Sequence, residues 1–372
     1  MGSNGSAQLE QIGDRNNSAI LQLSSDNQAT LLTNGASNGS SIAQIGSNNL
    51  ANVEQQGDGS VSIVSQNGTG GNADVNQLSD DSTSLVTQLA TDDRAVVNQS
   101  GTSQVSTIVQ SAPGTLALAG VVQLGEGNFS SIRQSGVPNG VAQFGSPDGS
   151  GAPLARIEQD GFQNSSEVTQ SGIVNGIFVF QTGDNNSSIV TQDGNLTQGL
   201  VRQTQDNNTA SITQSTTSVG TNVLATARLE QDGIGNDASI LQTGVSTAPN
   251  ATFAFSNQIG DANVSDIAQA GIDDRAFVTQ IGNTNMSIVT QNFGGSENFT
   301  DVDQDGNAGM STVEQSGTRN SATLEQTLGS AMGTSTITQN GILNMAEVTQ
   351  SGTGDFSAVS QTGTGNMVTV SQ

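Results

Sequence analysis

Apolar and polar residues alternate in short segments along most of the chain. Leu9, Ile20, Leu31 and Ile42 follow one another at intervals of 11 residues, and each has Ala or Ser two positions before it and Gln or Thr two positions after it. Because successive side chains of a β-strand point to opposite faces, residues that recur at every second position lie on one face. The pattern predicts a series of short strands, each of which buries a small residue, an apolar residue and a glutamine.

The glutamines set the period of the repeat. Taking one glutamine per segment, with Thr33 in place of one of them, gives 32 marks from Gln11 to Gln372, and 24 of the 31 intervals between marks are 11 residues long. Over the first twelve segments the small residue alternates between Ala and Ser, so the repeat is 22 residues long and has two unlike halves. A regular period of this length is typical of solenoids, in which each repeat stacks on its neighbours. The sequence predicts about 16 rungs of two strands each.

Turns are expected between the strands. Gly two residues after the mark and Asn five residues after it recur together, as in Gln44-Gly46-Asn49. Glycine adopts positive φ without steric cost, and asparagine tolerates the left-handed region. Each unit of 11 residues is therefore predicted to be a strand followed by a reversal.

We predict an all-β fold: a two-sheet β-solenoid of stacked strand-turn-strand rungs, with the cross-β spacing of about 4.7–4.8 Å that is typical of amyloid-like stacks. Residues 22 apart then lie above one another, so the glutamine amides can form a hydrogen-bonded ladder beside columns of Val and Ile. A buried amide without a partner costs about 1–3 kcal/mol, so the ladder also fixes the strand register. The core ladder is assigned to the glutamines Gln44, Gln55, Gln66, Gln77, Gln88, Gln99, Gln170, Gln181, Gln192, Gln203, Gln280 and Gln291 and to the valines Val53, Val75, Val97, Val168, Val179 and Val278.

Loop insertions are expected where the regular spacing fails. We assign residues 1–7 to an N-terminal segment and residues 8–372 to a single repeat solenoid, with insertions near 111–122, 144–155, 215–227, 243–254, 292–300 and 327–335. All five prolines fall in the irregular intervals, where a missing amide does not interrupt a strand ladder. The mark at Gln143 follows Gln134 by only nine residues, which indicates a deletion or a local failure of the repeat.

Composition excludes several classes of function. The formal net charge is −25, so nucleic acid and anionic membrane surfaces are unsuitable partners. The chain has no Cys and no His and therefore lacks thiolate nucleophiles, imidazole bases and the usual ligands of zinc and copper. No apolar run approaches the roughly 20 residues of a membrane span, and none follows Met1 as a secretion signal would. We expect no enzyme activity, no cofactor, no metal and no membrane insertion, and we expect an exported protein to be represented here in its mature form.

Adjacent acidic residues offer an alternative interpretation as calcium ligands or as a catalytic pair. These are Asp80-Asp81, Asp92-Asp93 and Asp273-Asp274. The repeats lack the glycine-rich nonapeptide of calcium-binding solenoids, and glycoside cleavage requires two carboxyl groups that face each other at a defined separation. We expect these acids to lie in the turns as solvated charges.

The ends of the predicted solenoid are the expected site of function. Soluble solenoids need capping elements, because an open rung presents an unpaired strand edge. The first strand is predicted within the first several residues and the last residue is itself a mark, so no cap is expected at either end. An uncapped head-to-tail surface propagates as a filament. The polymerisation ends are assigned to Leu9, Gln11, Ile20, Gln22, Val359, Gln361, Val370 and Gln372.

The repeat resembles the curlin repeats of curli, the bacterial functional amyloid of biofilm matrices. The segment QDGFQNSSEVTQ at residues 159–170 combines the glutamines, the turn glycine and asparagine and the alternating inward positions that carry this resemblance. The resemblance implies a structural subunit of a secreted, extracellular fibre that polymerises with copies of itself. It also implies a nucleator subunit and an outer-membrane secretion channel as partners.

Two functions without polymerisation remain as alternatives. An ice-binding solenoid would present a flat array of Thr on one sheet, whereas the outward positions here mix acidic, basic, polar and aromatic residues. A monomeric adhesin would carry a cap or a membrane anchor. The outward aromatic residues would either join rods side by side or form tolerated apolar surface; they include Phe178, Phe180, Phe253 and Phe255.

Overall fold

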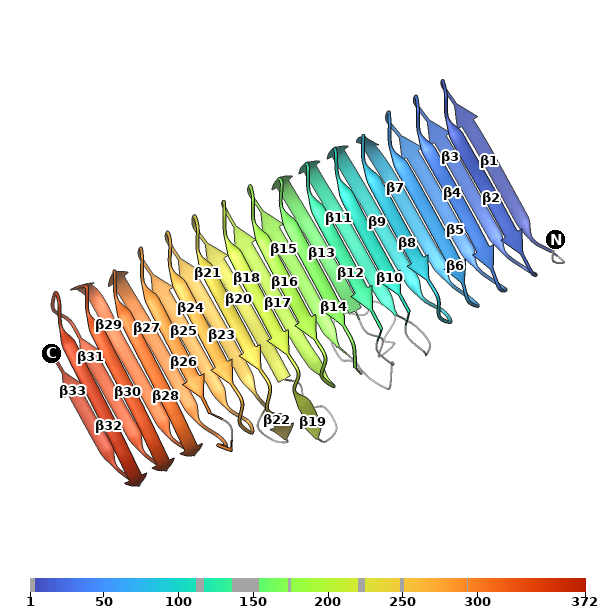
Figure 1. Ribbon diagram of the computed structural model, residues 1–372. Helices are drawn as coiled ribbons and strands as arrows, with labels where there is room; N and C mark the ends of the chain where they lie inside the picture. The colour runs from blue at the N-terminus through green and yellow to red at the C-terminus, as the bar shows by residue number, and fades with distance from the viewer. Residues whose placement is uncertain are drawn as a thin grey trace. The chain divides into compact units, whose positions relative to one another are not determined.

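The computed structural model of the chain is built from β-strands and turns. It describes residues 4–111, 117–135, 154–172, 175–219, 225–247, 251–292 and 294–372. The chain divides into two compact units, Met1–Asn185 and Asn186–Gln372. Each unit contains two parallel sheets, here called sheet A and sheet B, whose strands alternate along the chain (Figure 1). No helix among the described residues is long and apolar enough to cross a membrane.

The first unit runs from blue to green in Figure 1. Its sheet A contains β1 (Ser6–Ile12), β3 (Gln28–Asn34), β5 (Leu50–Gln56), β7 (Asn72–Asp80), β9 (Arg94–Thr102), β11 (Leu118–Glu126), β13 (Leu154–Phe162) and β15 (Gly176–Thr182). Its sheet B contains β2 (Asn17–Leu23), β4 (Gly39–Ile45), β6 (Val61–Asn67), β8 (Thr83–Gln88), β10 (Val105–Gln110), β12 (Phe129–Gln134) and β14 (Ser165–Gln170). Within each sheet the strands therefore follow their order in the sequence, and every second strand belongs to the other sheet.

The second unit repeats this arrangement. Its sheet A contains β17 (Thr197–Thr204), β20 (Ala225–Asp232), β23 (Phe253–Ile259), β25 (Arg275–Ile281), β27 (Phe299–Asn307), β29 (Ser321–Ala331), β31 (Met345–Gln350) and β33 (Met367–Ser371). Its sheet B contains β16 (Ser187–Gln192), β18 (Thr209–Gln214), β21 (Asp237–Gln242), β24 (Val264–Gln269), β26 (Met286–Gln291), β28 (Met310–Thr318), β30 (Thr334–Ile342) and β32 (Phe356–Thr364). Two short strands, β19 (Thr217–Val219) and β22 (Val245–Thr247), pair with each other beside these sheets.

Parallel pairing places residues 22 apart beside one another. Val53 of β5 pairs with Val75 of β7, and Val64 of β6 pairs with Val86 of β8. Where the chain contains extra residues, the register of the marks is kept: β12 pairs directly with β14, and Gln134 is the partner of Gln170. The structure confirms the predicted two-sheet β-solenoid with its 22-residue spacing.

The predicted mark at Gln143 lies outside the described residues. No described strand lies between β12 and β14 in sheet B, or between β11 and β13 in sheet A.

The core is a thin layer between the two sheets of each unit. It consists mainly of a column of Ile, Val and Leu, which are exposed by no more than 2% away from the outermost strands. This column is flanked by a column of mostly Ala or Ser on one side and by the glutamines on the other. Small residues keep the sheets close, and β-branched residues favour the extended backbone. One apolar side chain per strand gives little burial for a single rung, so each rung depends on its neighbours above and below.

Gly46 shows why the turns select glycine. Its φ is 111°, and a Cβ at this position would lie 2.0 Å from the carbonyl oxygen of Gly68 in the next rung. Stacked turns thus exclude a side chain at this position for two reasons, the backbone conformation and the close approach of the next backbone. Gly68 in turn lies under Ala90, where a Cβ would meet the carbonyl oxygen of Ala90 at 2.0 Å.

Candidate functional site

A ladder of glutamine side chains runs along the inner face of each sheet. Nε2 of Gln44 donates a hydrogen bond to Oε1 of Gln66 at 2.9 Å, and Nε2 of Gln66 donates to Oε1 of Gln88 at 2.8 Å. The same bond crosses the irregular intervals, since Nε2 of Gln123 donates to Oε1 of Gln159 at 2.9 Å. In every hydrogen bond between glutamines of the described residues, the earlier glutamine is the donor. The ladder therefore has a direction.

Each glutamine also links the two sheets. Nε2 of Gln44 donates to the backbone carbonyl of Gln28 at 2.9 Å, and Nε2 of Gln66 donates to that of Leu50 at 2.9 Å. Both carbonyls belong to strands of sheet A, while the two glutamines belong to sheet B. One amide group thus uses one N–H for the stack and the other for the opposite sheet, which satisfies a buried polar group that would otherwise be costly.

The structure places the residues assigned to the core ladder as follows. All twelve glutamines are buried, and the six valines have no exposed surface. Hydrogen bonds between neighbours of the ladder join Gln55 to Gln77, Gln77 to Gln99, Gln159 to Gln181, Gln134 to Gln170, Gln192 to Gln214, Gln203 to Gln231, Gln280 to Gln304 and Gln291 to Gln315, with distances of 2.8–2.9 Å.

A second ladder lies at the corner where each turn meets the next strand. Oδ1 of Asn27 accepts a hydrogen bond from the backbone N–H of Asn49 at 3.0 Å, and Nδ2 of Asn49 donates to the carbonyl of Gly68 at 3.0 Å. The pattern recurs in the second unit, where Asn285 donates through its N–H to Oδ1 of Asn263 at 3.0 Å. The sequence analysis assigned this asparagine only to the turn. Its regular recurrence five residues after the mark was the signal for an inward position.

The expectation that the adjacent acidic residues are solvated charges is wrong for two of the three pairs, Asp92-Asp93 and Asp273-Asp274. Asp80, Asp81 and Asp92 are exposed, but Asp93, Asp273 and Asp274 are buried. The reason is their place in the repeat, because Asp93 and Asp274 occupy positions of the asparagine ladder.

Asp274 replaces an asparagine without replacing its hydrogen-bond donors. Its Oδ1 accepts from the backbone N–H of Asn298 at 3.0 Å, as an asparagine oxygen would. A carboxylate has no N–H to offer to a neighbouring carbonyl. Burial raises the pKa of Asp274 to about 6, and burial also raises the pKa of Asp93 to about 6. Both carboxyl groups therefore favour the protonated form more than a free aspartate does.

The residues assigned to the polymerisation ends lie on the outermost strands. Leu9 is 48% exposed, Gln11 and Gln372 are exposed, Ile20, Gln22 and Val370 are partly exposed, and Val359 and Gln361 are buried. No described strand pairs with the outer edge of β1, β2, β32 or β33. The two ends of the ladder differ chemically. No described donor reaches Oε1 of Gln22, and Nε2 of Gln361 donates to the carbonyl of Met345 at 2.8 Å but to no glutamine.

The outward phenylalanines contact other side chains on the sheet surface. The rings of Phe178 and Phe180, on the same strand β15, lie parallel with their centroids 6.3 Å apart. Two contacts join neighbouring strands: the rings of Phe253 and Phe277 lie 5.2 Å apart, and the guanidinium of Arg228 lies over the ring of Phe255 at 5.3 Å from its centroid. Cross-strand contacts of this kind stabilise a sheet surface, which favours a structural role for these rings.

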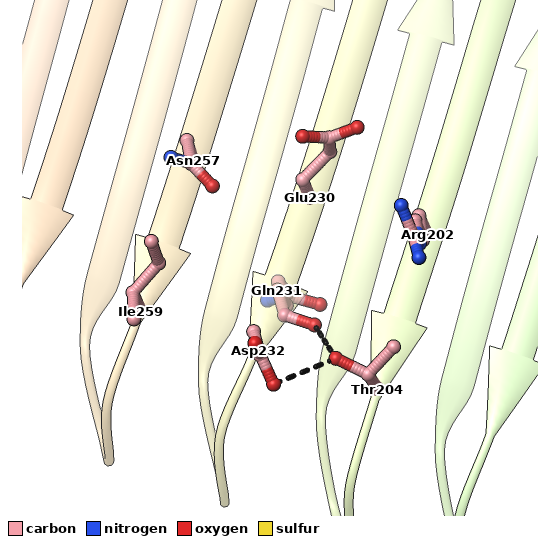
Figure 2. Close-up of a pocket in the computed structure, with 7 residues that line it drawn as sticks. All are labelled: Arg202, Thr204, Glu230, Gln231, Asp232, Asn257 and Ile259. Atoms are coloured by element: carbon pink, nitrogen blue, oxygen red, sulfur yellow. Dashed lines mark hydrogen bonds between the residues drawn. The ribbon is translucent and has the colours of Figure 1, made fainter.

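A shallow pocket of about 300 Å³ lies on the outer face of sheet A in the second unit (Figure 2). Figure 2 shows Oγ1 of Thr204 between Asp232 and Gln231; it donates to Oδ1 of Asp232 at 2.8 Å. The other acid of the pocket, Glu230, forms an ion pair with Arg228. Both carboxylates of the pocket are thus engaged by neighbouring side chains.

Comparison with known proteins identifies the repeat. The family model of the curlin associated repeat matches residues 295–327 and 344–372. No curated protein matches the chain. The matched residues contain the marks Gln304, Gln315 and Gln326 and the rungs that end the second unit, with the same ladder as the other rungs. The chain therefore contains curlin associated repeats in its second unit, and a repeat β-solenoid of this kind is a structural rather than an enzymatic architecture.

Proposed function

We propose that this chain is the structural subunit of a curli-like, extracellular amyloid fibre, which grows when copies stack end to end through their β-strands in a biofilm matrix. The observation that carries this proposal is the pair of unlike edges. Strands β1 and β2 present unpaired backbone, and β2 presents the acceptor end of the glutamine ladder at Oε1 of Gln22. Strands β32 and β33 present unpaired backbone, and β32 presents the donor end of the same ladder at Nε2 of Gln361.

Several features support a fibre in which all copies point the same way, head to tail. Every described strand pairs in parallel, so a further strand added to either edge would continue the same pattern. Unpaired edges are templates for strand addition, and a head-to-tail contact does not close on itself. The donor end of one copy is complementary to the acceptor end of the next. The partner of the chain is thus another copy of itself. The fibre that these copies form lies outside the cell.

The remaining partners follow from the family. A curli-type subunit is exported through an outer-membrane channel and is started by a nucleator subunit, and we propose both for this chain. Its charge of −25 keeps separate copies apart in solution and makes nucleic acid an unsuitable ligand.

Growth at the β33 edge tests the proposal with two adjacent substitutions. Val370 points inward on the last strand and Thr369 points outward. Val370→Arg would bury a charge beneath the first rung of the incoming copy, whereas the free chain keeps this partly exposed position in contact with water. We expect Val370→Arg to slow seeded elongation, followed by thioflavin fluorescence, by about tenfold or more, which corresponds to ~1.4 kcal/mol.

Thr369→Arg is the matched control and should elongate as the unmodified chain does. The unmodified chain should lose monomer after a lag that seeds remove. A chain that remains monomeric at all concentrations, or a Val370→Arg variant that elongates as fast as the control, would contradict the proposal and favour a binding module that does not polymerise.

A further inference from the structure

The outer face of sheet B in the first unit carries no charged side chain from β2 to β10. We call the outward side chains of β2, β4, β6, β8 and β10 the charge-free face. Its residues are apolar or small and polar, and several large ones are exposed: Leu21 is 52% exposed, Ile45 is 43% exposed and Ile63 is 44% exposed. The next strands end this face, because Arg133 lies on β12 and Glu167 on β14.

The other surfaces of the same unit are charged. The outer face of sheet A carries Glu10, Glu54, Asp74 and Arg94, on β1, β5, β7 and β9. Acidic residues also lie in the turns, and the whole chain has a net charge of −25. A surface of five adjacent strands without charge is therefore a local exception in a strongly acidic molecule.

The size of the face is sufficient for a contact. Five strands of about seven residues, at about 4.8 Å between strands and 3.3 Å per residue, span roughly 500 Å². Part of this area is apolar, and exposed apolar patches of a few hundred Å² on a monomer often have a function. The face is also regular, with rows of side chains at the strand spacing.

We propose that the charge-free face packs against the same face of a second copy, so that fibres pair side by side. This inference rests on the proposed fibre. An approach through the outer face of sheet A of this unit brings acidic side chains such as Glu10, Glu54 and Asp74 together, whereas this face carries none. Sheets pack face to face at about 10 Å through interdigitating side chains, and the same patch on both copies gives a two-fold contact.

Stacking explains why such a contact is weak between free chains and strong between fibres. About 500 Å² per copy is less than the roughly 800 Å² per partner of a stable complex, so two free chains pair weakly. In a fibre each subunit presents the same face along one side, and the contacts act together through a high effective concentration.

The test replaces two apolar residues of the face by acids and compares fibre width by electron microscopy. The variant is Ile63→Glu with Leu85→Glu, on the neighbouring strands β6 and β8. The control is Leu50→Glu with Leu78→Glu, which adds the same charge at exposed leucines on sheet A of the same unit. We expect paired fibres for the unmodified chain and the control, single fibres for the face variant, and equal seeded elongation rates for all three. The proposal would be overturned if the face variant still formed paired fibres, or if the control formed single fibres as often as the face variant does.

A second measurement keeps this inference separate from the proposed function. The chain has no cysteine, so Ile63→Cys introduces a single thiol at the centre of the face, and Leu50→Cys does the same on sheet A. If the chain forms no fibres, the fibre proposal fails, and the soluble Ile63→Cys chain should still give dimers with a bis-maleimide that spans the ~10 Å between packed sheets. Equal crosslinking of both thiols, or none at high protein concentration, would overturn the pairing of this face. So would a chain that stays monomeric and inhibits ice growth through this face.

Discussion

Replacing Val86 by Asp is expected to prevent the first unit from folding. Val86 has no exposed surface and lies in register between Val64 and Ile108. Burial of an unpaired carboxylate among these side chains costs several kcal/mol, about 3–5 kcal/mol in comparable cases. A domain of ordinary stability has only about 5–15 kcal/mol in total. Because each rung supports its neighbours, the loss should spread along the stack, and the denaturant midpoint should fall sharply or the transition should be lost.

Thr87→Asp is the matched control for this prediction. Thr87 follows Val86 on β8, is similar in size to a valine, and points outward beside the uncharged Ser65 and Val109. A surface substitution of this kind usually changes stability by no more than about 0.5 kcal/mol. Circular dichroism during denaturation measures both variants. Equal loss of stability in the two would mean that the inward face of β8 has been assigned wrongly.

The stability of the second unit is expected to fall as the pH rises from about 4 to 6, because the buried side chain of Asp274 loses its proton in this range. The folded-state pKa of Asp274 is raised to about 6 by burial, above the ordinary aspartate value of 3.8. Between these values the folded chain binds a proton that the unfolded chain has released, so folding is favoured by acid in this window. Below this pH window, Asp274 is protonated in both the folded and the unfolded chain. Above the window, it is charged in both, and the folded chain bears the full cost of the buried charge. Asp274→Asn restores the donor of the ladder and should raise the stability at pH 7 by up to about 3 kcal/mol.

Asp266→Asn removes the same charge from an exposed position on β24 and serves as the control. Denaturant midpoints measured from pH 4 to 8 should show the slope for the unmodified chain and for Asp266→Asn, and a flatter profile for Asp274→Asn. Identical profiles for all three would show that Asp274 does not titrate in this range.

The periodicity of the sequence was sufficient to predict the fold class. Each inward position is constrained by the rung above and the rung below, so the identities of Gln44, Gln66 and Gln88 report one stacked geometry. Few folds impose such a constraint at every repeat. The regular recurrence of one residue type at one spacing therefore predicted both the strands and their register.

Other features could not be obtained from the pattern. The burial of Asp93 and Asp274 was missed because the same Gly-x-x-Asn spacing is compatible with a solvent-exposed turn and with an inward corner. The direction of the glutamine ladder was also missing, since either end of an amide can face the next rung and only the bonds across the sheets decide.

Distances between spin labels test the central claim most directly. Residues in register along the outer face of sheet A allow labels at Glu10 together with Asn76, Asn98, Val122 or Glu158, and the chain has no native cysteine to interfere. We expect the distance to rise by about 4.8 Å with each rung, from roughly 14 Å for the first pair to roughly 29 Å for the last. The step from Val122 to Glu158 should be as short as the others although it spans 36 residues. Distances that grow with sequence separation, or broad distributions without steps, would contradict a stack in which residues 22 apart lie above one another.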